Sequence, residues 1–214
     1  ISSSHKTDDP REGTRNMIER ARTANDAGLD TLFVGDHHVT SFNYYQNTPI
    51  LGRILAEWSG NPFGALYLLP LWNPVLLAEH IGTLAAIAPG RFIMQCGLGD
   101  GQQGEGMGID MSKRVGLFEA SLAVMRALWA GETVNEERYW GLKDARITPA
   151  PAEPVEIWAG AIVPAAIRRA ARLVDGWLGA PSLTLGQAGS AISRYQRACD
   201  EFGRAPTAVA LRRD

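Results

Sequence analysis

An acid and two imidazoles directly follow an apolar run in the stretch LFVGDHHV (32–39). Asp36, His37 and His38 stand there together, and the two histidines are half of the chain's four. An imidazole at a strand end suits a proton donor or a hydrogen-bond donor, because its ordinary pKa is about 6.5. Asp36 could orient that imidazole or bind a ligand hydroxyl. Neighbouring strand residues point to opposite faces, so we expect His37 to face the site and His38 to pack against a neighbouring loop.

A metal site and a plain structural role are the alternatives for these residues. On a strand, His37 and His38 cannot easily share one ion, because their side chains leave opposite faces. Neither a His-x-x-x-His nor a Cys-x-x-Cys pattern accompanies them. We therefore expect no metal, while the structural role stays open.

Glycines and a further acid follow a second apolar run, in CGLGDGQQGEG (96–106). A dinucleotide fingerprint would need Gly-x-Gly-x-x-Gly leading straight into a helix. Gly97-Leu98-Gly99-Asp100-Gly101-Gln102 lacks that pattern, and we expect no helix to open at once. Two interpretations stay open: a flexible loop, or close approach of the backbone to a flat ligand with Asp100 contributing a carboxylate. We expect the long segment from Gly97 to Met111 to be a mobile lip of the site.

Two other stretches could hold parts of a ligand. WAGAIVP (158–164) is typical of a strand, a short turn and the start of a helix, whose free N–H groups favour a phosphate. An ordinary strand–helix connection is the alternative. YLLP (67–70) and Trp72 either pack in the core or wall a ring-binding cleft.

The elements that must position these residues alternate along the chain. Apolar runs predict strands at 1–4, 29–34, 64–69, 91–97, 155–159, 176–180 and 207–211. Helical spacing, with Pro10 and Pro74 suited to first turns, predicts helices at 10–28, 49–58, 74–88, 112–130, 164–174 and 185–202. Long connections, which are often functional, remain at 39–48, 97–111 and 132–154.

Buried strands that are each followed by a helix indicate a parallel sheet covered by helices. A doubly wound sheet and a (β/α)8 TIM barrel both fit, and we expect one domain over 1–214. In both architectures ligands bind beyond the carboxyl ends of the strands, where the four stretches above lie.

The composition of the chain limits the classes of binding partner and the cellular location that we expect. A net charge of −2 and a pI of about 6.1 give no strong attraction to nucleic acid or to an anionic membrane. We expect no membrane span, because no apolar run reaches about 18 residues, and no signal peptide in ISSSHKTDDP. Cys96 and Cys199 indicate reduced thiols in a cytoplasmic protein, with a bridge between them as the alternative.

Four successive segments resemble the bacterial luciferase-like monooxygenase family. They are AGLDTLFVGDHH (27–38), LLPLWNPVLLAEHIGTLAAIAPGRFIMQCGLGDG (68–101), RVGLFEASLAVMRALWAGETV (114–134) and EIWAGAIVPAAIRRAARLVDGWL (156–178). The resemblance runs from about Ala24 to Trp177, and its strand–NP–helix–GRF–strand–GLG block is the most specific part. It implies a (β/α)8 barrel that uses FMN or the deazaflavin F420. Because family proteins usually run longer, it also implies a barrel that is incomplete at the C-terminal end.

The resemblance also implies roles for single residues. In F420-dependent members similar to glucose-6-phosphate dehydrogenases, an Asp-His pair follows the second strand, which makes Asp36 a cofactor contact and His37 a catalytic acid. The run Leu98-Gly99-Asp100 would give cofactor contacts from Leu98 and Gly99 and an acidic catalytic residue at Asp100. The subgroup has Glu at that last position, which puts its sugar chemistry in doubt here.

The resemblance implies further cofactor contacts less directly. Leu69, at the end of the third strand, would lie under the cofactor ring. Gly160 and Ala161 would form the phosphate turn, although the family's second glycine is absent.

The resemblance thus implies an oxidoreductase that moves a hydride, or activates oxygen for monooxygenation, on a small organic substrate. F420 is favoured because GDHH and GLGD resemble that subgroup, and FMN is the alternative. A non-catalytic flavin-binding barrel is the alternative function. We expect the assembly to be a homodimer.

Overall fold

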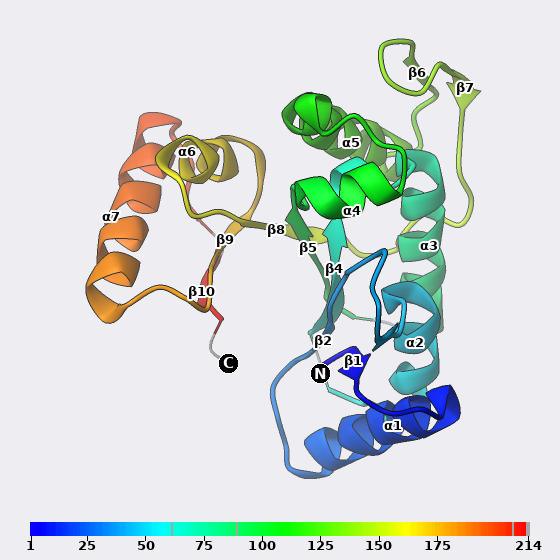
Figure 1. Cartoon of the computed structure of the whole chain (residues 1–214). Coiled ribbons are helices and arrows are strands. Elements are labelled where there is room, and N and C mark those ends of the chain that lie inside the picture. Colours follow the sequence, from blue (N-terminus) through cyan, green and yellow to red (C-terminus); the bar gives the residue numbers. More distant parts are fainter. Residues whose placement is uncertain (61, 89, 207, 213–214) are drawn as a thin grey trace. The chain divides into compact units, whose positions relative to one another are not determined.

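The computed structural model describes residues 1–60, 62–88, 90–206 and 208–212, and its chain divides into two compact units (Figure 1). The first unit combines Ile1–Phe92 with Leu98–Val155, and the second combines Ile93–Gly97 with Glu156–Asp214. Pro89 and Thr207, which the sequence places after a helix and at the start of the last strand, lie outside the described residues. The single domain expected over 1–214 stays a prediction.

The first unit contains a parallel strand pair and most of the helices. Its elements are β1 (Ser4–His5), α1 (Pro10–Asp26), β2 (Leu32–Val34), β3 (Asn43–Tyr44), α2 (Asn47–Ile54), β4 (Phe63–Leu68), α3 (Pro74–Ile87), α4 (Gly101–Gly106), α5 (Arg114–Trp129), β6 (Val134–Glu136) and β7 (Leu142–Ala145). Single 3-10 turns lie at η1 (Leu55–Glu57), η2 (Leu69–Leu71) and η3 (Met111–Lys113). β2 and β4 are parallel, with Leu32 opposite Phe63.

Local signals in the sequence fix where the long helices of this unit begin. α1 and α3 both start at a proline, whose missing N–H costs nothing in a first turn. The Asn73 side chain caps α3 by accepting the amides of Val75 and Leu76 at 2.9 and 3.3 Å. The buried face of α3 then packs beside α5, and α5 in turn packs against η2, the turn that follows the carboxyl end of β4.

The second unit is a parallel sheet with two helices. Its elements are β5 (Phe92–Gly97, its first residue in the first unit), β8 (Glu156–Gly160), α6 (Pro164–Leu173), β9 (Gly176–Gly179), α7 (Leu185–Glu201) and β10 (Ala208–Leu211). The strand order is β5-β8-β9-β10, and every neighbour is parallel. α6 and α7 pack against each other, and the fully buried rings of Trp177 and Tyr195 stack at 6.0 Å.

Three of the sequence expectations need correction. The strand expected at 1–4 is β1, which pairs antiparallel with β3 and not with the parallel strands. The connection 132–154 contains the antiparallel hairpin β6–β7. We expected no helix to open at Gly101, and this was wrong: α4 begins there. A two-residue strand and a six-residue helix have too little periodicity to be read from sequence.

Among the described residues, no helix has the length and apolar character needed to cross a membrane.

Candidate active site

Asp36 is a buried carboxylate just beyond the carboxyl end of β2. Its side chain is fully buried, and its Oδ2 accepts the backbone amide of Leu68 at 2.8 Å and the indole N–H of Trp72 at 2.9 Å. A buried charge needs such donors, because an unpaired one would cost several kcal/mol. The end of β4 and the turn η2 therefore hold Asp36 in place.

The second carboxylate oxygen of Asp36 faces His38. Asp36 Oδ1 lies 3.2 Å from His38 Nε2, but the pair lacks the geometry of a hydrogen bond. Neither atom has another partner among the described residues, and both are buried. Such unsatisfied polar atoms are uncommon in folded proteins and are typical of functional sites. The two atoms together offer an acceptor and a donor to a ligand.

Aromatic rings surround this pair. Trp72 meets His38 edge-on at 5.8 Å, Tyr67 at 5.5 Å and His80 at 6.0 Å. Burial raises the pKa of Tyr67 far above its usual value, a weak bond from Thr48 lowers it, and the nearby Asp36 charge raises it further. Tyr67 is thus a neutral phenol at physiological pH, and the wall beside Asp36 excludes water.

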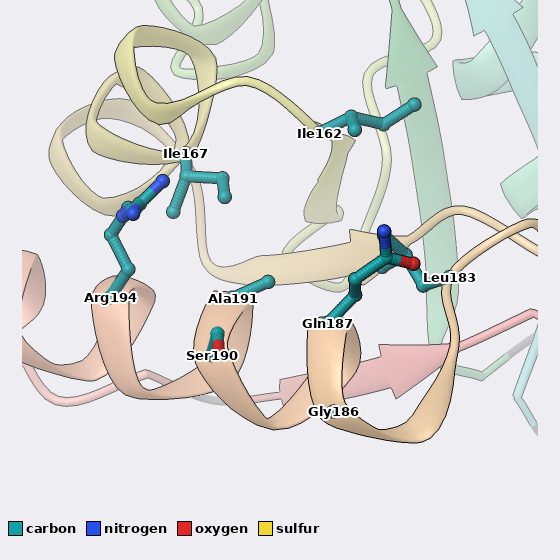
Figure 2. A pocket seen from close by; sticks show the side chains of 8 residues that line it. All are labelled: Ile162, Ile167, Leu183, Gly186, Gln187, Ser190, Ala191 and Arg194. Atoms are coloured by element: carbon teal, nitrogen blue, oxygen red, sulfur yellow. The ribbon is translucent and has the colours of Figure 1, made fainter.

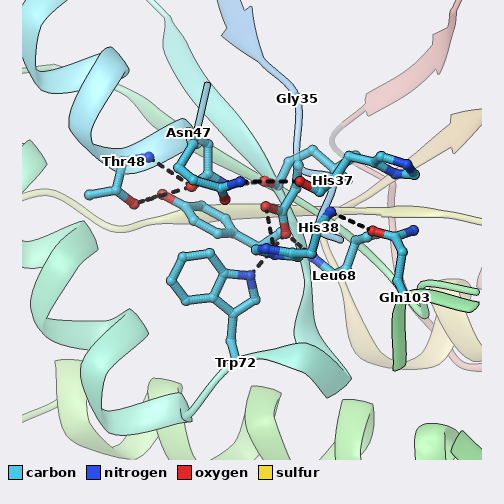
Figure 3. A network of polar contacts seen from close by, with 12 residues as sticks. Gly35, His37, His38, Asn47, Thr48, Leu68, Trp72 and Gln103 are labelled. Carbon is cyan, nitrogen blue, oxygen red and sulfur yellow. Dashed lines mark hydrogen bonds and ion pairs between the residues drawn. The ribbon is translucent and has the colours of Figure 1, made fainter. Parts of the chain in front are cut away.

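His37 makes different contacts from His38. Its imidazole stacks on Phe42 at 6.5 Å and lies tilted against Tyr44 at 5.6 Å. Figure 3 shows this ring directed away from His38 and Trp72. The two histidines diverge, as expected, but the one beside Asp36 is His38. His37 is half-buried and lies close enough to Asp100 for their charges to interact.

Asp100 is the N-cap of α4. Its Oδ1 accepts the amide of Gln103 at 2.9 Å, and its Oδ2 accepts the side-chain Nε2 of Gln103 at 2.6 Å. These two bonds, and a smaller contribution from the charge of His37, hold the pKa of Asp100 below its usual value. Asp100 is therefore ionised at neutral pH, so that it acts through its charge and its hydrogen bonds.

Asp100→Ala is expected to lower the free energy of unfolding at pH 7 by about 1 kcal/mol, the usual cost of losing an N-cap. Because the folded-state pKa of Asp100 is lowered, its contribution is complete above the unfolded pKa of about 3.9. The contribution disappears as the pH falls through the lower folded-state pKa. Thermal unfolding of parent and variant should therefore differ at pH 7, and the difference should shrink as the pH falls through the lowered folded-state pKa of Asp100.

The exposed Asp30 provides a control, because Asp30→Ala should leave the unfolding temperature almost unchanged at pH 7 and in acid. A difference between parent and Asp100→Ala that persists undiminished in acid would contradict the capping role.

The other predicted cofactor contacts of the first unit lie in different surroundings. Leu98 is half-buried, and Gly99 has a φ of 70°, a conformation that favours glycine. The backbone at Gly99 passes beside Leu68 and Leu71, where an added Cβ would lie 3.6 Å from both side chains. Leu69 is completely buried, backbone as well as side chain, so none of its atoms is exposed to a ligand in this structure.

Gly160 and Ala161, the predicted phosphate turn, lie in the second unit. Gly160 ends β8 and is exposed. The amide of Ala161 donates to Leu178 O at 3.3 Å, and its carbonyl accepts the indole N–H of Trp177 at 2.9 Å. The Ala161 amide is therefore already used inside the unit, and other groups would have to bind a phosphate here.

A pocket of about 360 Å³ adjoins this turn (Figure 2). Its lining is mostly apolar on the α6 side and polar along α7, where Figure 2 shows Gln187, Ser190 and Arg194 in a row. The full lining is Ile162, Ile167, Leu183, Gly186, Gln187, Ser190, Ala191 and Arg194. Arg194 is the cation of this pocket and supplies the charge that an anionic ligand requires.

Sequence reasoning missed two residues of the site. Gln103 was read only as part of a glycine-rich loop, and Trp72 was left between core and cleft. The only signal for Gln103 was its position three residues after an acid, which is a capping pattern. Among the described residues, no group of three or more His, Cys, Asp or Glu side chains could hold a metal ion.

Comparisons with known proteins identify the family of the chain. The profile described as luciferase-like monooxygenase matches residues 2–213. An F420-dependent glucose-6-phosphate dehydrogenase of Beutenbergia cavernae is 31% identical over 174 residues, which cover 77% of this chain and 52% of that protein. The chain spans about half the length of the curated relatives it matches.

Solved structures share the fold. An F420-dependent secondary alcohol dehydrogenase, in complex with an F420–acetone adduct, superposes with a TM-score of 0.83 at 20% identity, over 99% of this chain and 67% of that chain. The FMN complex of the oxygenating constituent of 3,6-diketocamphane monooxygenase from Pseudomonas putida superposes with a TM-score of 0.82 at 21% identity. This match covers 98% of this chain and 64% of that chain.

The predicted fold class is thereby confirmed. The described residues contain six parallel strands, whereas a complete (β/α)8 barrel has eight. The profile match over nearly the whole chain and the four resembling segments lead to one assignment: the chain belongs to the luciferase-like monooxygenase family.

Proposed function

We propose that the protein is an oxidoreductase that uses F420 to transfer a hydride to or from a small organic substrate. FMN-dependent monooxygenation is the alternative, because similar folds with both cofactors are known. The observation that carries the proposal is the buried pair of unsatisfied atoms, Asp36 Oδ1 and His38 Nε2. An acceptor beside a donor matches the amide edge of a flavin or deazaflavin ring, where N–H and C=O groups alternate.

A bound deazaflavin supplies the hydride, and the protein supplies position and protons. Asp36 Oδ1 would accept a ring N–H, while Oδ2 stays fixed by Leu68 and Trp72. His38 Nε2 would donate to a ring carbonyl. His37, half-buried and therefore able to exchange protons with water, would be the proton donor to the substrate. The Asp100 carboxylate lies close enough to His37 to act on it electrostatically.

In the second unit, we propose that a phosphate group binds at the turn of Gly160 and Ala161 and in the adjoining pocket, through groups other than the Ala161 amide, which donates to Leu178 O. Arg194 supplies the cation, and the turn leads into the first turn of α6. Support comes from the lining of the pocket and from the family's strand–turn–helix pattern.

We also propose a cytoplasmic homodimer. Both cysteines are free and buried, which fits a reducing compartment. The dimer itself rests on the sequence expectation, and sedimentation of the purified protein would decide it.

Titration with F420 and with FMN, followed by absorbance and fluorescence, is the direct test of the proposed function. F420 is expected to bind with a Kd in the micromolar range, and FMN about tenfold more weakly, a difference of about 1.4 kcal/mol. The exposed acid Asp30 provides the control, since Asp30→Asn should bind both cofactors as the parent does.

Tighter binding of FMN than of F420 would favour the alternative function, FMN-dependent monooxygenation. Failure of both cofactors to bind at about 100 µM would overturn it. Tight binding without reduction by any substrate tried would instead favour a non-catalytic flavin-binding barrel.

A further inference from the structure

The turn that carries the two histidines is held in an unfavourable conformation. Val39, which directly follows His38, has a φ of 54°. A β-branched residue rarely adopts that region, and such strain persists only where surrounding contacts hold it. The contacts that hold this turn therefore decide where the His38 imidazole lies.

Gln46 Nε2 donates to the carbonyl of His37 at 3.2 Å, and the short helix α4 supplies two further contacts. The buried side chain of Gln103 accepts the backbone amide of His38 through Oε1 at 2.8 Å (Figure 3). One turn later, Gly106 lets the helix approach Val39 so closely that an added Cβ would lie 2.7 Å from Val39 Cγ1. The turn is thus held on both sides of the His38–Val39 peptide.

The orientation of the Gln103 amide follows from Asp100. Nε2 donates to Asp100 Oδ2 at 2.6 Å, while the Gln103 backbone amide donates to Oδ1 at 2.9 Å. The reversed amide would place oxygen against the carboxylate and NH₂ against the His38 amide, so only one orientation satisfies both neighbours. The ionised Asp100 therefore selects the orientation in which Gln103 accepts from His38.

We propose that Gln103 is a positioning residue of the active site. Its side chain, oriented by the Asp100 carboxylate, holds the His38 backbone and so keeps the His38 imidazole beside Asp36 and Trp72. This assigns Asp100 a role through Gln103, instead of proton transfer to substrate. The proposal rests on the proposed function only for its effect on cofactor binding, and its geometry can be tested without a cofactor.

Two variants separate this role from simple support of α4. Gln103→Met keeps the length and apolar body of the side chain but removes both polar contacts. Asp100→Asn keeps an oxygen to cap the helix, but its new NH₂ attracts Gln103 Oε1 away from His38. The controls are Gln102→Met, on the exposed side of α4, and Asp110→Asn, which alters the cap of η3.

Amide hydrogen exchange measured by NMR in the cofactor-free protein is the first readout. Both test variants should exchange the His38 amide roughly tenfold faster, while the Gly104 amide, bonded to Asp100 O, keeps its protection in Asp100→Asn. The nuclear Overhauser contact between the His38 and Trp72 rings should weaken in both. Both controls should match the parent.

Cofactor titration is the second readout, and F420 affinity should fall about tenfold in both test variants. Unchanged His38 exchange and an unchanged ring contact in Gln103→Met would overturn the proposal. Altered exchange with unaltered F420 affinity would also overturn it, because the turn would then not serve the site. If the parent itself binds no cofactor, the proposed function fails, while the exchange and ring-contact results still decide whether Gln103 positions His38.

Discussion

Asp36→Ala is expected to weaken F420 binding about 30-fold, equivalent to about 2 kcal/mol. The substitution removes Oδ1, the acceptor that has no regular partner, and leaves the amide of Leu68 and the indole N–H of Trp72 unpaired. Because these two donors stay buried without an acceptor, the free energy of unfolding should also fall by about 1–3 kcal/mol. An absorbance titration and urea unfolding of the same preparations measure the two effects.

Asp36→Asn separates binding from stability in this experiment. It keeps the shape of the side chain and retains one acceptor, so it should lose less unfolding free energy than Asp36→Ala but still bind F420 weakly. The exposed Asp30→Ala should match the parent in both measurements. Unchanged F420 affinity in Asp36→Ala would show that Asp36 is only a structural residue of this strand end.

His37→Ala is expected to slow cofactor reduction by about 10²–10⁴-fold, the usual contribution of general acid–base catalysis. In this direction the imidazole would accept the substrate proton that it donates in the reverse reaction. The effect of His37→Ala on F420 affinity should be small, because the His37 ring contacts Phe42 and Tyr44 and not Asp36. His38→Ala should show the opposite pattern, with weaker binding and a smaller change in rate, since its Nε2 lies 3.2 Å from Asp36 Oδ1. Single-turnover reduction on both variants, combined with titrations, measures this contrast.

Reduction of the cofactor by His37→Ala at the parental rate would remove the catalytic assignment from His37. A large rate loss in His38→Ala with unchanged binding would transfer that assignment to His38. His80→Ala is the matched control, because this imidazole meets the Trp72 ring edge-on at 6.0 Å, as His38 does at 5.8 Å.

Much of the fold could be predicted because local signals dominate it. Prolines at the first turns of α1, α3 and α6 and buried runs at β4 and β5 mark these elements within one or two residues. The helix α4 could not be predicted, since GQQGEG has low helix propensity and the element depends on the Asp100 cap. The pairing of β1 with β3 joins residues about forty positions apart, and no periodic pattern marks it.

The polar cluster beyond β2 was predictable from the sequence, but the contacts within it were not. A polar cluster beyond a buried strand indicated Asp36, and this follows from the general placement of ligands at strand ends. The prediction that His37 faces the site and His38 a neighbouring loop assumed strand alternation, but β2 ends at Val34, so the rule does not extend to positions 37 and 38. The partnership of Gln103 with His38 depends on tertiary contacts across 65 residues, which composition and spacing do not encode.

The most direct test of the central claim is an NMR titration of ¹⁵N-labelled protein with F420, observed at the indole N–H signals. The six tryptophans give six candidate signals, assigned by single substitutions. Trp72 donates to Asp36 Oδ2, whereas Trp129 donates to the carbonyl of Ala78 in a similar half-buried setting and serves as the internal control. We predict that the Trp72 signal shifts with the same saturation as F420 absorbance while that of Trp129 stays in place. An unmoved Trp72 signal at saturating F420 would contradict the account, because the cofactor ring would then not lie at Asp36.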